Sequence, residues 1–134
     1  MSGSRSIRGS VAVTAAFDVM ALVAFVVAGM GSHNEGAVPA YFLRNAVPLV
    51  VSWLGFAALL GTYHRPGFAT LWRTWVVAVP IALVGRSWWV GSPSGTRFLT
   101  FLAVGMAFTG LFLLIGRGLS ALITGRGYPS RRRA

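Results

Sequence analysis

The chain has 134 residues, of which 55% are hydrophobic and 10% are charged, and its mean hydropathy is +0.70. A soluble domain carries about 25% charged residues, so this composition excludes an ordinary water-soluble protein and indicates one compact unit in a membrane. The net charge is +10, but the arginines cluster near the ends of apolar runs and in the tail, which is typical of membrane topology rather than of nucleic-acid binding. Because the chain has no cysteine, disulfides and Cys-ligated metals are excluded.

The first apolar run covers residues 10–30, and its only charged residue is Asp18. Its length is close to the roughly 20 residues that a helix needs to cross a hydrocarbon core about 30 Å thick. A carboxylate inside such a span costs on the order of 3 kcal/mol, so it needs a partner, a water-filled path or a proton. The run is too long for the apolar part of a cleaved signal peptide, and residues 1–9 are therefore predicted to be a cytoplasmic N-terminal segment.

Three further apolar runs follow, at residues 45–63, 72–90 and 98–116, and the third run of the chain carries Arg86. Loops rich in Gly, Pro, Ser and His separate them. Because none of the runs alternates between polar and apolar residues, they do not fit a barrel. The sequence predicts an all-α polytopic membrane protein with a four-helix transmembrane bundle over residues 10–124. A basic tail at 125–134 is predicted to be disordered.

The distribution of arginine predicts the orientation in the membrane. With four spans, both termini and the loop at 64–71 lie on one side. That side has nine arginines and the other has three, so the positive-inside rule predicts a cell-membrane protein with both termini in the cytoplasm. The nine are Arg5, Arg8, Arg65, Arg73, Arg117, Arg126, Arg131, Arg132 and Arg133, and the three are Arg44, Arg86 and Arg97.

Asp18 and Arg86 are the candidate intramembrane charge pair or coupling site. At 1.5 Å per residue, Asp18 lies about 12 Å into the first span and Arg86 about 21 Å into the third, measured from the same side. A long Arg side chain bridges most of the offset of about 9 Å if the two helices are neighbours. We therefore expect an Asp18–Arg86 pair that neutralises both charges. Two alternatives stay open: Arg86 extends to the outer interface beside Trp88 and Trp89, or it contacts an external anion.

A second group of polar residues, His33, Glu35 and Arg44, is predicted on the outer side. A metal site needs three or four ligands and no third His or Cys is near, so we interpret this group as a solvated turn and expect no metal. The sequence shows no phosphate-binding loop and no nucleophilic triad. We therefore expect neither enzymatic activity nor a cofactor.

Four features follow one another along the chain: Asp18, the Gly-Ser-His-x-Glu-Gly element at residues 31–36, Pro48, and Gly85-Arg86. In this order the chain resembles DUF3054, a family of small prokaryotic membrane proteins of unknown function, over residues 12–116. The resemblance implies four membrane helices with an Asp in the first and an Arg in the third. It implies no activity.

Two classes of function fit these residues. The first is an accessory or oligomerising membrane subunit, in contact with the lipid bilayer and with copies of itself or another membrane protein, that contains an internal Asp–Arg pair. The alternative is a minimal proton- or ion-coupled transporter using Asp18, because one carboxylate in the first of four helices resembles the layout of small multidrug resistance transporters. A pigment- or cofactor-binding subunit using His33 or His64 ranks third. A dry, closed pair at Asp18 favours the first class, and a wet, unpaired carboxylate favours transport.

Overall fold

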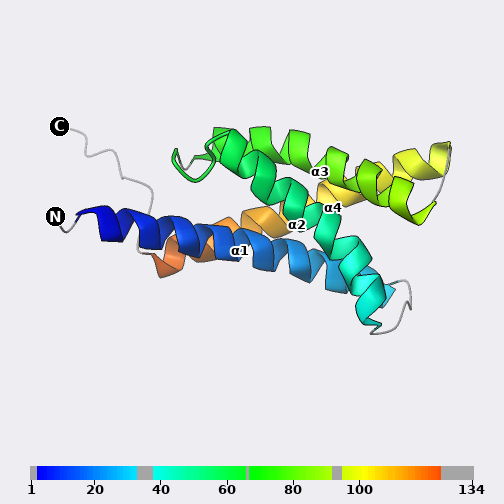
Figure 1. The fold of residues 1–134 in the computed structure, drawn as a ribbon, viewed down its shortest axis with the longest axis horizontal. Coiled ribbons are helices and arrows are strands. Elements are labelled where there is room, and N and C mark those ends of the chain that lie inside the picture. Colours follow the sequence, from blue (N-terminus) through cyan, green and yellow to red (C-terminus); the bar gives the residue numbers. More distant parts are fainter. Residues whose placement is uncertain (1–2, 33–37, 66, 92–94, 125–134) are drawn as a thin grey trace.

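The computed structural model describes residues 3–32, 38–65, 67–91 and 95–124 (Figure 1). Each of its four helices is long and apolar enough to cross a membrane, and no strand occurs in these ranges. The predicted all-α, four-span membrane fold is confirmed. The helices are α1 (Gly3–Ser32), α2 (Pro39–Leu59), α3 (Phe68–Val90) and α4 (Thr96–Ile123).

Several helix ends differ from the predicted spans. The backbone of α1 is helical from Gly3, so most of the predicted N-terminal segment is continuous with the first helix. Helix α2 begins at Pro39, where proline is favoured because the first turn needs no N–H donor, and ends at Leu59. The chain then reverses through a turn in which Gly61 has a φ of 67°, a conformation that favours glycine. The predicted tail at 125–134 lies outside the described residues.

The end of α4 also differs from the prediction, and this difference affects the site. Apolar residues resume after Arg117, and the helix continues to Ile123 instead of stopping at Gly116. Arg117 therefore lies inside the last membrane helix, six residues before its end.

The helices form a ring in chain order. Helix α1 packs mainly on α4 and α2 mainly on α3, while α1 also packs on α2 and the α3–α4 contact is the smallest. Helices α1 and α3 do not pack against each other in the described part of the chain, so they occupy opposite corners. The start of α1, the turn between α2 and α3 and the end of α4 lie at one end, which we call the Asp18 end (Figure 1). The opposite end, where α3 finishes and α4 begins, is called the Arg86 end.

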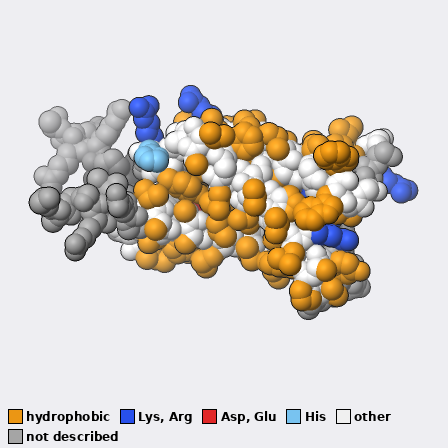
Figure 2. Space-filling view, viewed as in Figure 1, with side chains coloured by type: hydrophobic (Ala, Val, Ile, Leu, Met, Phe, Trp, Pro, Cys, Tyr) orange, Lys and Arg blue, Asp and Glu red, His pale blue; other side chains and the backbone are white. Residues whose placement is uncertain are grey.

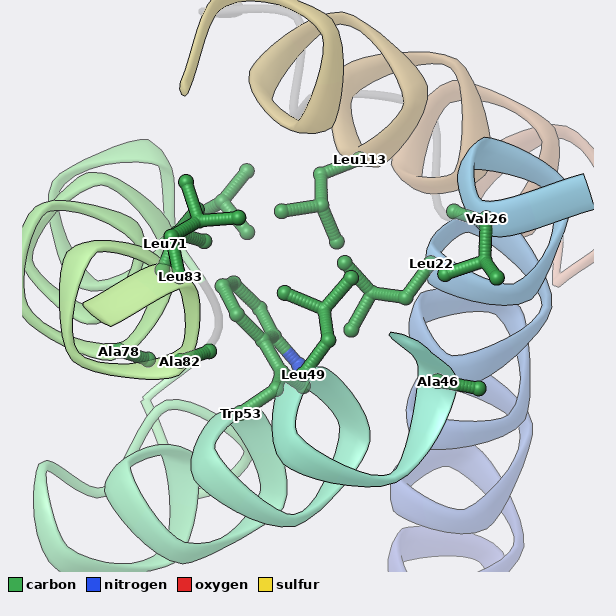
Figure 3. Close-up of a cluster of buried hydrophobic side chains, with 12 residues drawn as sticks. Leu22, Val26, Ala46, Leu49, Trp53, Leu71, Ala78, Ala82, Leu83 and Leu113 are labelled. Carbon is green, nitrogen blue, oxygen red and sulfur yellow. The ribbon is translucent and has the colours of Figure 1, made fainter. Parts of the chain in front are cut away.

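The core of the bundle centres on Trp53 of α2, which is fully buried. Leu22 of α1, Leu83 of α3 and Leu113 of α4 surround its indole ring (Figure 3). Most other apolar side chains point outward: they cover the middle of the molecule, and the basic side chains lie toward its ends (Figure 2). This apolar belt is the surface expected to meet lipid chains.

Candidate functional site: a buried carboxylate cluster

Asp18 is fully buried, and its carboxylate is held by a bidentate ion pair with Arg117 of α4. Arg117 donates from Nε to Oδ1 and from Nη2 to Oδ2, each over 2.8 Å. Such paired N–H bonds from a planar guanidinium are among the strongest that a carboxylate accepts. The pair joins α1 to α4 directly.

Two further donors from α2 and from the turn that follows it reach the same carboxylate. The hydroxyl of Tyr63 donates to Oδ2 of Asp18 over 2.9 Å. The indole N–H of Trp53 lies 3.3 Å from the same oxygen and 3.1 Å from the hydroxyl of Tyr63. Burial, together with the neighbouring carboxylate, raises the pKa of the Tyr63 phenol above its ordinary value, so the hydroxyl stays protonated and remains a donor. We call Asp18, Trp53, Tyr63 and Arg117 the Asp18 cluster.

A glycine lets α4 come close enough to α1 for this contact. A Cβ atom at Gly116 would lie 3.1 Å from Cβ of Ala21 and 3.2 Å from the backbone oxygen of Phe17. Asp18 follows Phe17 in α1 and Arg117 follows Gly116 in α4, so this close approach of the helices brings the two charged side chains together. The absence of a side chain at Gly116 therefore positions the ion pair.

The predicted Asp18–Arg86 pair is wrong. The side chains that donate to the Asp18 carboxylate come from α2, the following turn and α4, and Arg86 is not among them. The physical reason is the ring order, because α1 and α3 lie at opposite corners and the two side chains lie toward opposite ends. The prediction required neighbouring helices, and this condition is not met.

Arg86 instead lies near the other end of the bundle, on the inner side of α3. Its Nε donates to Oδ1 of Asn45 in α2, and its guanidinium carbon lies 5.0 Å from the ring centre of Phe101 in α4. Trp88 and Trp89, which follow it, are 90% and 66% exposed, as expected of residues at a membrane interface.

The outer-loop cluster is only partly described. His33 and Glu35 lie outside the described residues, and Arg44 lies over the ring of Tyr41 at 4.6 Å. His64 is exposed in the turn after α2, at the Asp18 end. No group of three or more His, Asp or Glu side chains that suits a metal ion occurs in the described ranges.

Sequence reasoning identified Asp18 but missed its partners. The predicted fourth span ends at residue 116, directly before the charge of Arg117, and therefore leaves Arg117 outside the membrane. The depth of the two residues in their helices is the signal that indicates this partner. Asp18 lies seven residues inside the span Val11–Ser32 and Arg117 lies six residues before Ile123, so both are about 10 Å from the same end of the bundle. Trp53 is buried in the core, and the sequence does not predict that its indole N–H donates to Asp18.

The profile of the DUF3054 family, described as a protein of unknown function, matches residues 15–120. The chain therefore belongs to the DUF3054 family, as its resemblance implied. Comparison with curated proteins and comparison with solved structures give no match. The family description assigns no chemistry, so function is argued below from the residues.

Proposed function

We propose that this chain is a multi-pass protein of the cell membrane that acts by association, as an accessory subunit or a homo-oligomer, and that its buried ion pair is structural. The observation that supports this best is the closure of the Asp18 carboxylate. It is fully buried, and three side chains from two other helices and a turn donate to it. An acid in this state fixes the bundle, because releasing it would break several hydrogen bonds at once.

Proton- or ion-coupled transport is the second candidate, since Asp18 is an acid buried in a membrane helix. A coupling carboxylate must exchange its proton with both sides of the membrane. Asp18 would first have to release Arg117, and the large cavity described below has no lining residue in the Asp18 cluster. These observations favour a structural role for the acid.

An outward face of α2 is suited to association. Gly55 and Ala58 are exposed one turn apart, and a Cβ at Gly55 would meet nothing within 4 Å. Small residues on an exposed helix face let a second helix approach closely in a membrane. The corresponding glycines of α4 are used inside the bundle: Gly105 faces Leu83, and Gly110 faces Trp75.

Both termini are proposed to be cytoplasmic. The Asp18 end carries Arg65, Arg73 and Arg117. The start of α1 and the end of α4 also lie there, and the sequence is rich in arginine near both termini. A reporter enzyme that works only in the cytoplasm should be active when it is fused after Ala134. Activity of a reporter that works only outside the cytoplasm would overturn this orientation.

The role of Asp18 is tested by measuring one substitution in two ways. Purified wild type, Asp18→Asn and the control Arg73→Gln, which alters an exposed arginine, are placed in vesicles with a pH-sensitive dye inside. We expect no proton flux above that of empty vesicles from any of them under an imposed gradient, and a lower yield of folded Asp18→Asn. Flux in the wild type that Asp18→Asn abolishes while the protein stays folded would establish transport instead.

Association is tested by crosslinking in native membranes and in vesicles. We expect wild type to give a crosslinked product and Gly55→Leu to reduce it, because the larger side chain separates the helices. Gly118→Leu, at an equally open position on α4, should leave the product unchanged. A chain that is monomeric in vesicles and crosslinks to no protein in native membranes would contradict the proposal.

A further inference from the structure

A cavity of about 640 Å³ lies in the half of the bundle nearer the Arg86 end. This volume is within the roughly 300–1,000 Å³ typical of small-molecule sites. All four helices contribute to its lining, which is mainly apolar and includes Phe25 and Val26 of α1, Leu49 of α2, and Phe101 and Phe112 of α4. Such a lining suits a hydrocarbon chain rather than a hydrated solute.

The cavity opens sideways at the depth of lipid chains. Val104 and Phe108 line it and are each 50% exposed, so part of its wall is open on the outer surface of α4. They lie eight and twelve residues after Thr96, which places them about 12 and 18 Å from the start of the helix. At that depth the surrounding medium is hydrocarbon, and an occupant would enter from the bilayer.

The polar part of the lining lies at headgroup depth. Arg97 is exposed on the first turn of α4, and Arg86 lies four residues before the end of α3, about 6 Å from that end. The contacts of Arg86 with Asn45 and Phe101 fix its guanidinium at the cavity. Arg97 therefore places a positive charge at one end of the lining, and apolar side chains form the other end.

We propose that this cavity binds an anionic phospholipid. The lipid phosphate contacts Arg97, and one acyl chain enters the apolar part past Val104 and Phe108. Charge and depth both support this orientation, because arginines bind phosphate through directed N–H bonds and lie where a headgroup lies. The inference does not depend on whether the chain associates or transports.

The test compares two lipids with the same acyl chains, phosphatidylglycerol and phosphatidylcholine, titrated onto the detergent-purified full chain and followed by native mass spectrometry. We expect tighter binding of phosphatidylglycerol. Removing a charged hydrogen bond in Arg97→Gln should weaken that binding on the order of tenfold and reduce the preference. Arg73→Gln, which loses an exposed arginine at the Asp18 end, should bind like wild type. Equal binding of the two lipids, or an Arg97→Gln variant that binds like wild type, would overturn the proposal.

A second variant tests the acyl-chain part without altering charge. Val104→Phe enlarges a side chain of the cavity wall and should reduce retention of phosphatidylglycerol, whereas Val76→Phe, at a lipid-facing position outside the cavity, should not. Inorganic phosphate alone should compete poorly because it has no chain. Full displacement of the lipid by phosphate, or unchanged retention in Val104→Phe, would instead indicate a simple anion site and would contradict lipid binding.

Discussion

The charged side chains at the two ends of the bundle have different surroundings. At the Asp18 end, a buried acid and an arginine of equal depth meet across α1 and α4, and Tyr63 and Trp53 supply the remaining hydrogen bonds. At the Arg86 end, the exposed Arg97 borders a cavity whose lining is mainly apolar. The closed end is suited to holding helices together, and the open end is suited to binding an anion from outside the bundle. Depth and neighbouring helices, rather than the presence of a charge, separate the two roles.

The largest expected effect is the loss of Arg117. Arg117→Gln leaves a fully buried carboxylate without its cation, which should lower the free energy of unfolding by about 3–5 kcal/mol. Asp18→Asn should cost less, because Arg117 is 17% exposed and can extend toward the nearby headgroups. Chemical unfolding in detergent micelles, followed by tryptophan fluorescence, measures both. An Arg117→Gln variant as stable as Arg73→Gln would remove the basis for the structural role.

The next effect concerns Tyr63. Tyr63→Phe removes one donor to the charged carboxylate and one of the two acceptors of the Trp53 N–H, so the same unfolding measurement should show a loss of about 1.5–3 kcal/mol. Tyr41→Phe changes an exposed tyrosine of α2 and is the matched control. If both variants lose equally little, the hydroxyl of Tyr63 does not contribute to the cluster.

A substitution at the close contact between α4 and α1 is expected to lower stability by a smaller amount. Gly116→Ala places a methyl group against the backbone oxygen of Phe17, which cannot move without shifting the helix. Relative to Gly118→Ala, whose Cβ would meet nothing within 4 Å, we expect a loss of about 1–3 kcal/mol from overpacking. Thermal unfolding of the two variants provides the comparison, and equal midpoints would show that the helices separate without cost.

The smallest effect is expected at Gly105, although a Cβ atom there would make a shorter contact than a Cβ atom at Gly116. A Cβ there would lie 2.8 Å from Cδ1 of Leu83, and Leu83 itself lines the cavity and has space to move. We therefore expect Gly105→Ala to cost less than Gly116→Ala, within about 1 kcal/mol of wild type. A larger loss at Gly105 than at Gly116 would mean that the Arg86 end is as tightly packed as the Asp18 end.

The sequence predicted the number and class of the helices because twenty-residue apolar runs have few other solutions in a chain of this composition. It predicted that Asp18 needs a partner because a carboxylate inside an apolar span is costly. It did not predict Arg117, because a charge near the end of an apolar run resembles the end of the span. It also did not determine which helices are neighbours, and the Asp18–Arg86 hypothesis depended on that order.

The central claim, that Asp18 and Arg117 form one structural unit, is tested most directly by a double-mutant cycle on unfolding free energy. The cycle uses Asp18→Asn, Arg117→Gln and their combination, and a parallel cycle replaces Arg117→Gln by Arg86→Gln. We expect the Asp18–Arg117 combination to be less damaged than the sum of its single variants, with a coupling of about 1–3 kcal/mol, and the Asp18–Arg86 combination to be additive within about 0.5 kcal/mol. Additivity in the first cycle, or strong coupling in the second, would contradict the account.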